Sequence, residues 1–195
     1  MQTIIKPGIL KILRIFYSNG NKPVHLREIA RSSHMNESTA SMHLNSLVKK
    51  GILKAAVEGN LKKFYISKDF TPVILPLFDY ERLENLPLLR KNAIKIYLKS
   101  LETKPLLAVV FGSTAKGNFK NDSDIDILEV SNSKDNRSKR VVEAQTGVHM
   151  QVFRIGEKQF IEELKLKKDN VVQSALNTGF PVFNQKYYYE VIYNE

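Results

Sequence analysis

The sequence predicts a two-domain α+β protein, in which a small basic domain precedes a larger domain of strands and helices. Residues 1–69 carry helical patterns followed by a hairpin pattern, residues 70–87 concentrate prolines, and residues 88–195 interleave apolar strand-like runs with helical stripes. A chain of 195 residues, of which 43% are hydrophobic, is long and apolar enough to form two small cores.

The composition excludes several kinds of site. The chain has no cysteine, which rules out disulfides, thiolate metal sites and iron–sulfur clusters, and its 4 histidines are too scattered for a clear zinc motif. Any metal is therefore expected to have oxygen ligands, which favours Mg²⁺ or Mn²⁺. No apolar run reaches the roughly 18 residues of a spanning helix, and the first residues lack the features of a signal peptide. We expect a cytoplasmic protein with no membrane partner.

The positive charge is concentrated in the first domain. Residues 1–69 contain 12 lysines and arginines against 4 acidic residues, whereas residues 70–195 contain 18 against 16. A basic domain beside a nearly neutral one indicates that the first domain binds a polyanion. The alternative interpretation is an ordinary lysine-rich solvated surface.

The first domain shows the patterns of three helices and a hairpin. Apolar residues recur at helical spacing over 9–16, and a cap is expected at the Asn-Gly-Asn of 19–21. A short helix is predicted over 26–32, and Asn36 is expected to cap a longer one that runs to Lys50. Apolar runs and alternation over 52–66, around a Glu-Gly-Asn turn, predict a two-stranded hairpin.

This order resembles the winged helix-turn-helix of arsenic-repressor-like and multiple-antibiotic-resistance-like regulators. Burial of Ala40, Leu44 and Leu47 would turn a polar face of the third helix toward a DNA major groove, and lysines would flank it. The predicted DNA-binding residues are Ser38, Thr39, Ser41, Met42, Asn45, Lys49, Lys50, Lys62 and Lys63. The resemblance implies double-stranded DNA as the partner and a homodimer that meets two half-sites. Winged helices also serve as protein-docking or dimerisation modules, which is the alternative.

The segment between the domains is interpreted as a packed hinge. Residues 70–87 are too apolar for a loose linker and too rich in proline for a long helix. A helix is predicted from Leu88 to Leu101, with Leu88 and Leu89 on its apolar face and lysines opposite. This helix is one candidate for the seam of the homodimer.

In the second domain, one strand is expected to end, and the next strand to begin, at polar groups. The apolar run 106–111 predicts a strand covered on both faces, which stops at Gly112-Ser113. Such a turn from strand to helix presents free backbone amides that suit phosphate groups. In the following strand, Asp124 and Asp126 are two residues apart and so project from the same face. Their carboxylates repel each other and favour a shared divalent cation, unless they are merely solvated turn residues.

Together these segments resemble the nucleotidyltransferase superfamily, in particular its minimal members. The resemblance is carried by Phe111-Gly112-Ser113-Thr114-Ala115-Lys116-Gly117, followed by Ser123-Asp124-Ile125-Asp126-Ile127. It implies a mixed sheet flanked by helices over residues 88–195. It also implies that Gly112, Ser113 and Lys116 bind a nucleoside triphosphate, while Asp124 and Asp126 are catalytic and hold Mg²⁺ or Mn²⁺ for nucleotidyl transfer to a hydroxyl group.

The sequence departs from this superfamily at three positions. Many members carry arginines where this chain has Thr114 and Lys116. Active members place a third carboxylate on a later strand, and the matching position over 148–153 is Gln151, whose amide cannot accept a proton. His149 is predicted on the same side as Gln151 and is the candidate substitute base, although a lone histidine on a strand is commonly structural. Glu129 is expected to point to the opposite face.

The remainder of the chain shows structural patterns. Helical stripes are predicted over 160–164 and 171–176, and residues 180–183 are expected to form an edge strand or extended segment. The tyrosines at 187–189 are interpreted as packing residues rather than as a base-stacking platform.

Two functional hypotheses from different classes remain. In the first, a DNA-binding protein carries a nucleotidyltransferase that uses a magnesium nucleotide. In the second, a transcriptional regulator carries a related domain that only senses a nucleotide or mediates assembly, because the third acid is missing. A role in a toxin–antitoxin pair that modifies a partner protein follows only from analogy with the family.

Overall fold

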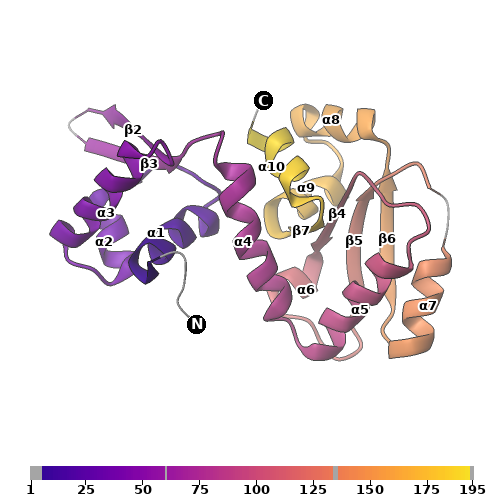
Figure 1. Cartoon of the computed structure of the whole chain (residues 1–195). Helices are drawn as coiled ribbons and strands as arrows, with labels where there is room; N and C mark the ends of the chain where they lie inside the picture. The colour runs from indigo at the N-terminus through magenta and orange to yellow at the C-terminus, as the bar shows by residue number, and fades with distance from the viewer. Residues whose placement is uncertain (1–5, 60, 134–135, 194–195) are drawn as a thin grey trace. The chain divides into compact units, whose positions relative to one another are not determined.

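The computed structural model describes residues 6–59, 61–133 and 136–193. The chain divides into two compact units, Met1–Phe78 and Asp79–Glu195, and each is described by itself (Figure 1). The division falls inside the segment 70–87 that was interpreted as a hinge. Within the described ranges, no helix is both long enough and apolar enough to cross a membrane.

The first unit is a winged helix-turn-helix. Its helices are α1 (Pro7–Ser18), α2 (Leu26–Ser33) and α3 (Glu37–Lys49), and its strands are β1 (Val24–His25), β2 (Leu53–Glu58) and β3 (Leu61–Ile66). The three predicted helices and the hairpin are confirmed. β1 was not predicted, because two residues are too few to show a pattern; it pairs antiparallel with β3 and completes a sheet of order β1-β3-β2.

Local capping and a shared core explain this unit. The side chain of Asn36 accepts a hydrogen bond of 2.7 Å from the amide of Thr39, as expected of an N-cap. Each helix contributes fully buried side chains to the core, as do the strands. The buried set comprises Ile12, Leu13, Phe16, Ile29, Ala30, Ala40, Leu44, Leu47, Val24, Leu53, Phe64 and Ile66.

The proline-rich segment forms a helix, which corrects the sequence interpretation. α4 runs over Thr71–Glu84 and contains both Pro72 and Pro76. Pro72 lies in the first turn, where backbone amides have no partner within the helix, so it removes no bond. Pro76 removes one interior bond, and buried side chains such as Leu75 and Phe78 offset that loss.

The second unit is a mixed sheet between helices, as predicted. Its elements are α5 (Leu88–Ser100), β4 (Leu107–Phe111), α6 (Gly112–Lys116), β5 (Ile125–Val130), α7 (Arg137–Thr146), β6 (Met150–Ile155), α8 (Glu157–Leu166), α9 (Asn170–Thr178), β7 (Phe180–Phe183) and α10 (Gln185–Tyr193). The strand order is β6-β5-β4-β7. β4 is antiparallel to β5 and β7, whereas β5 and β6 are parallel. β7 is therefore the predicted edge strand.

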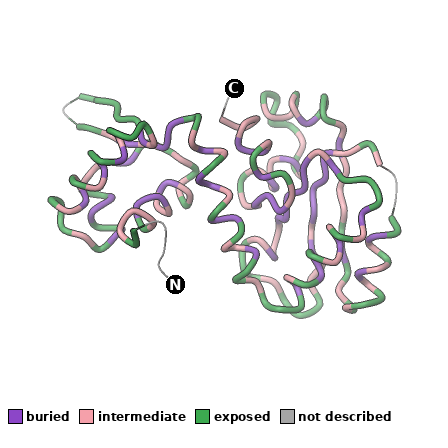
Figure 2. The backbone as a smooth tube through the Cα atoms, viewed as in Figure 1, coloured by how far each residue is buried: buried purple, intermediate pink, exposed green. Residues whose placement is uncertain are grey.

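Side-chain alternation divides the sheet into two faces. Ala108, Val110, Ile125 and Ile127 belong to the core cluster that α5 and α7 cover, and these two helices pack against each other. Every residue of β4 is buried, which fits a strand covered on both sides (Figure 2). The other face meets α9, because a Cβ atom built on Gly179, directly after α9, would contact Val109.

Three details of this unit differ from or extend the sequence interpretation. Leu88 and Leu89 are exposed rather than part of the buried face of α5, which instead carries Arg90. α7 was not predicted, because its sequence is polar. Tyr188 and Tyr189 are buried in α10, so the interpretation of these two tyrosines as packing residues is confirmed.

Candidate functional site

The two halves of the motif meet at one edge of the mixed sheet. In the strand register, Asp126 lies opposite Phe111 of β4 on one side and Gln151 of β6 on the other. Phe111 is followed directly by Gly112, the first residue of α6. The end of β4 and the starts of β5 and β6 therefore bring the turn, the carboxylates and Gln151 together.

Gly112 is the position at which the turn and the carboxylate touch. Its backbone adopts φ +66°, a conformation that glycine reaches without strain. A Cβ atom built there would overlap Oδ2 of Asp126 and lie 3.1 Å from its Cγ. Only a residue without a side chain lets the Asp126 carboxylate approach the turn so closely.

The electrostatics of the two neighbouring aspartates favour a bound cation. Burial and the neighbouring charge of Asp124 raise the pKa of Asp126, while Arg90 acts in the opposite direction. Two carboxylates suit Mg²⁺, which is commonly bound by one or two such groups together with substrate phosphates. Among the described residues, no group of three or more His, Cys, Asp or Glu side chains could hold a metal. The donor set thus fits an ion shared with a polyphosphate better than a closed protein site.

Gln151 and His149, the two candidates for a third catalytic group, have different surroundings. The amide of Gln151 donates a hydrogen bond of 2.9 Å to Oδ2 of Asp124, so Gln151 lies beside the carboxylate pair. Nδ1 of His149 is 3.5 Å from Glu143 of α7, and the His149 side chain is 72% exposed. Gln151 therefore orients Asp124, whereas the His149 imidazole is directed to α7.

Arg90 is a residue of this site that sequence reasoning missed. It is only 5% exposed, and its guanidinium donates to Oγ1 of Thr114 at 2.7 Å and to the carbonyl of Ser123 at 2.6 Å. The spacing of Arg90 with Ala93 and Tyr97, three and seven residues later, is the signal that places it on the buried stripe of α5.

The predicted phosphate-binding residues differ in exposure. Gly112 and Ser113 are half-buried at the start of α6, where the first backbone amides have no partner within a helix. Lys116 is exposed in the last turn. Thr114 is buried against Arg90 instead, so its hydroxyl is not available to a phosphate.

Comparison with known families identifies both units. Residues 91–190 match the nucleotidyltransferase domain family, which is more than half of the chain. The chain belongs to this family. Residues 9–55 match the IclR helix-turn-helix domain. This match confirms the prediction of a helix-turn-helix in the first unit. No curated protein gives a significant match to the chain.

Two solved structures are similar to the chain. One is a candidate DNA-binding protein from Ralstonia eutropha JMP134, at 23% identity and a TM-score of 0.34, covering 38% of this chain and 98% of that one. The other is a transcriptional regulator from Thermotoga maritima, at 20% identity and a TM-score of 0.34, covering 60% of this chain and 80% of that one. The fold assignment of the nucleotidyltransferase domain depends on the family match and not on these likenesses.

A buried polar network lies on the face of the sheet opposite the aspartates. Glu129 accepts hydrogen bonds of 2.9 Å from the hydroxyl of Tyr97 and from Nε of Arg154. Burial and Glu129 raise the pKa of Tyr97 well above its usual range, so the phenol remains a donor. The prediction that Glu129 points away from Asp126 is confirmed.

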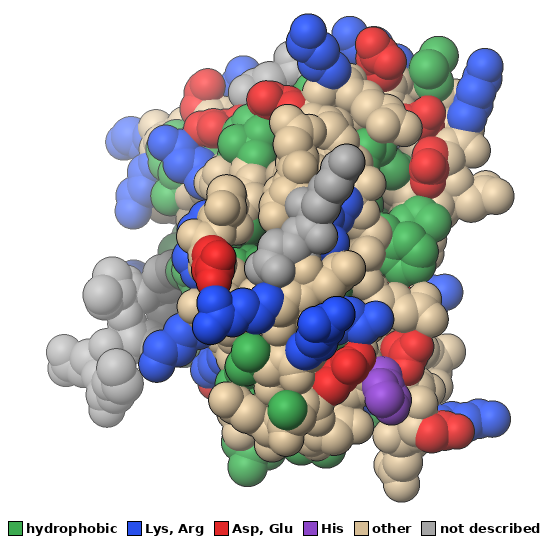
Figure 3. All heavy atoms as spheres, turned by 90° about the vertical axis from the view of Figure 1, so that its right-hand side faces the viewer, with side chains coloured by type: hydrophobic (Ala, Val, Ile, Leu, Met, Phe, Trp, Pro, Cys, Tyr) green, Lys and Arg blue, Asp and Glu red, His purple; other side chains and the backbone are tan. Residues whose placement is uncertain are grey.

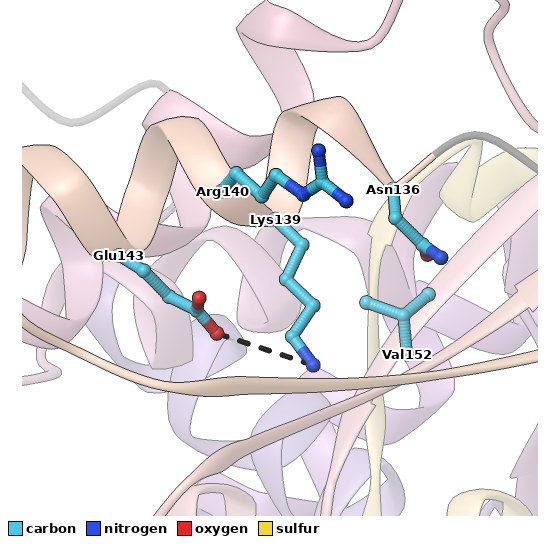
Figure 4. A pocket seen from close by; sticks show the side chains of 5 residues that line it. All are labelled: Asn136, Lys139, Arg140, Glu143 and Val152. Atoms are coloured by element: carbon cyan, nitrogen blue, oxygen red, sulfur yellow. Dashed lines mark ion pairs between the residues drawn. The ribbon is translucent and has the colours of Figure 1, made fainter.

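A pocket of about 300 Å³ lies on that same opposite face. It is lined by Asn136, Lys139, Arg140 and Glu143 of α7 and its N-cap, and by Val152 of β6 (Figure 4). Val152 alternates with Gln151, so the pocket is separated from the aspartates by the sheet. Basic and acidic side chains are interspersed on the side of the nucleotidyltransferase domain that faces right in Figure 1 (Figure 3).

In the helix-turn-helix domain, the predicted DNA-binding residues are largely accessible. Ser38, Met42, Asn45, Lys49, Lys50 and Lys62 are exposed, while Thr39, Ser41 and Lys63 are half-buried. The buried face of α3 is formed by Ala40, Leu44 and Leu47, as predicted. Lys63 forms an ion pair with Glu58 across the hairpin, and this contact lowers the pKa of Glu58.

Proposed function

We propose that this protein binds DNA through its winged helix-turn-helix and a magnesium nucleoside triphosphate through its nucleotidyltransferase domain, and that it transfers the nucleotidyl group to a hydroxyl acceptor. The observation that carries the proposal is the contact of the Asp126 carboxylate with Gly112 of the turn. This contact supports the proposal, because the acid that would hold a cation lies beside the turn that would bind phosphate.

Each residue of the site has a distinct part in this proposal. Asp124 and Asp126 would hold Mg²⁺ or Mn²⁺, which when bound neutralises charge on the polyphosphate. The amides of Gly112 and Ser113 would bind phosphate oxygens, since the start of a helix favours anions. Lys116 would add a positive charge at the exposed end of the same short helix.

The proposed reaction replaces pyrophosphate on the α-phosphorus. An acceptor hydroxyl oxygen forms the new bond to phosphorus, the bond to the bridging oxygen breaks, and pyrophosphate leaves. The proton of the acceptor passes to water, because the amide of Gln151 cannot accept it. The chain would contribute positioning and charge stabilisation rather than a general base.

A second candidate function is favoured by Gln151. Its amide donates to Asp124 at 2.9 Å, where a third carboxylate would be needed for proton abstraction. A site of this kind binds the nucleotide without turnover. The protein would then be a transcriptional regulator in which the domain is a nucleotide sensor or an assembly module.

The experiment that separates these candidates is label transfer. The protein is incubated with α-³²P-labelled nucleoside triphosphates, Mg²⁺ or Mn²⁺, and candidate acceptors. Labelled acceptor supports the transferase, whereas metal-dependent nucleotide binding without transfer supports the sensor. Asp124→Ala should abolish metal-dependent binding, and Asp122→Ala is the matched control because Asp122 is an exposed acid two residues earlier. Unchanged binding in Asp124→Ala would refute the metal assignment.

For the first domain, the proposal is an electrostatic contact with double-stranded DNA by a homodimer in the cytoplasm. The excess of 12 basic over 4 acidic residues in 1–69 supports it, and so does the exposed polar face of α3. The exposed Leu88 and Leu89 support α5 as one seam of the homodimer. Affinity for non-specific duplex DNA should fall steeply as the salt concentration rises. An affinity that does not change with salt would contradict the proposed DNA binding. Equilibrium sedimentation that gives a single chain would exclude the homodimer.

A further inference from the structure

Arg90 connects the two halves of the nucleotide site from an element outside the motif. Its guanidinium donates to Oγ1 of Thr114 in α6, at 2.7 Å, and to the carbonyl of Ser123, directly before Asp124, at 2.6 Å. It also bonds to the carbonyl of Lys120 at 3.0 Å and lies 4.1 Å from the ring centroid of Phe119. One buried side chain thus holds the turn, the loop and the start of β5.

This connection matters because the turn and the aspartates reach the site from different elements. The turn follows β4, Asp124 directly precedes β5, and the loop 117–124 joins them. A divalent ion shared between Asp124 and a polyphosphate requires both parts to be held at one spacing, and small displacements are costly in such sites. The planar fork of an arginine suits this task, because it directs several donors at fixed angles.

The charge of Arg90 has no carboxylate partner among the contacts that fix it. Its hydrogen bonds go to a hydroxyl and to backbone carbonyls. Burial lowers the pKa of Arg90, and the nearby charges of Asp124 and Asp126 act in the opposite direction. The side chain is only 5% exposed, and its guanidinium donates to a hydroxyl and to backbone carbonyls, so its donors are directed at the protein rather than at a bound phosphate. Its contribution to the site is therefore the spacing of other groups.

We propose that Arg90 is a positioning residue that couples metal binding by Asp124 and Asp126 to nucleotide binding by the Gly112-Ser113 turn. The inference rests on the proposed function, because it concerns the same site. It goes beyond it in assigning the coupling to a residue of α5. Without Arg90, each half would still bind its own ligand, but neither ligand would favour the other.

The test measures the coupling and not activity. Affinities for each of the four nucleoside triphosphates are measured with and without Mn²⁺, and Mn²⁺ affinity is measured alone. Arg90→Lys keeps the positive charge but loses the fork, so we expect the enhancement of nucleotide affinity by Mn²⁺ to fall by about 10-fold. Mn²⁺ affinity in the absence of nucleotide should not change. Arg154→Lys is the matched control, because Arg154 is a half-buried arginine that pairs with Glu129, on the face of the sheet opposite the aspartates.

A second variant covers the case in which Arg90→Lys does not fold. Thr114→Val removes the hydroxyl that accepts the Arg90 bond and preserves the shape of the side chain. It should weaken the coupling in the same direction. Wild-type coupling in either folded variant would overturn the inference while the proposed function stands. If the wild-type protein shows no Mn²⁺-dependent nucleotide binding, the proposed function fails and the inference fails with it.

Discussion

The carboxylate of Asp126 lies directly against the α-carbon of Gly112, with its Cγ only 3.1 Å from where a Cβ would be. This contact joins the strand that carries the aspartates to the turn that follows the neighbouring strand. Because Gly112 also has φ +66°, the position excludes a side chain for two independent reasons. The close approach of acid and turn is therefore a feature of the fold.

Gly112→Ala should therefore cost more stability than an ordinary glycine substitution. The backbone conformation alone costs about 1 to 3 kcal/mol, and the overlap with Asp126 adds to it. Gly117→Ala is the matched control, because Gly117 has φ +73° but nothing within 4 Å of the new atom. The difference between the free energies of unfolding of the two variants in urea gives the cost of the overlap. Equal losses of stability would show that Asp126 moves aside freely. Metal-dependent nucleotide binding should be lost only in Gly112→Ala.

Asp126→Asn should stabilise the metal-free protein at neutral pH. Burial and Asp124 raise the pKa of Asp126 in the folded state, so the folded protein holds this proton more tightly than the unfolded chain. The group's contribution to stability consequently decreases as pH rises from its unfolded pKa through its folded pKa. The difference in Tm between Asp126→Asn and wild type should be larger at pH 7 than at pH 4. Mg²⁺ should raise the Tm of the wild type but not of the variant.

The Gly112-Ser113 turn and the pair of aspartates could each be predicted from the sequence, because each depends on a pattern of neighbouring residues. A fully apolar run ending in Gly-Ser predicts a buried strand and a turn, and the spacing of Asp124 and Asp126 puts them on one face. The family resemblance supplied Gln151 as the position that matches the third carboxylate. Its register with Asp126 follows from the parallel pairing of β5 and β6, which the sequence pattern alone does not predict.

What could not be predicted depends on tertiary context. Arg90 is a charged residue on a stripe that periodicity assigned to leucines, and only the polar acceptors around it make its burial favourable. Proline content argued against a helix over 71–84, but Pro72 falls in the first turn, where it removes no bond. His149 lies directly before β6, so the alternation of side chains along the strand does not fix the direction of its imidazole.

Arg154→Met should strongly destabilise the nucleotidyltransferase domain. Glu129 is 2% exposed and depends on Arg154 for charge compensation, so removal of the partner leaves a buried carboxylate and costs about 3 kcal/mol or more. Tyr97→Phe removes one hydrogen bond to the same carboxylate and should cost about 1 kcal/mol. Urea unfolding measures both losses of stability, and a loss in Arg154→Met no greater than in Tyr97→Phe would show that the buried Glu129 does not depend on Arg154.

Gln151→Asp should convert the site toward catalysis. The new carboxylate lies in register with Asp126 and supplies the proton acceptor that the amide lacks. We expect label transfer to a hydroxyl acceptor to increase relative to wild type, measured with α-³²P-labelled nucleotide and Mn²⁺. Gln151→Ala is the control for loss of the hydrogen bond to Asp124. If both variants bind nucleotide but neither transfers label, the protein lacks a feature that binds the acceptor. That result would favour the sensor hypothesis.

Lysines of the helix-turn-helix domain should contribute unequally to DNA affinity. Lys49 and Lys50 are exposed at the end of α3, whereas Lys63 is half-buried and paired with Glu58. The charge of a lysine that is already paired with a carboxylate is partly compensated, so it neutralises a phosphate less completely and fewer counterions leave the DNA. Lys49→Gln and Lys50→Gln should each reduce the slope of log affinity against log salt by about 1, and Lys63→Gln should reduce it by less. Lys99→Gln, an exposed change in the other domain, should leave the slope unchanged. Equal effects of all four variants would mean that net charge, and not the face of α3, determines binding.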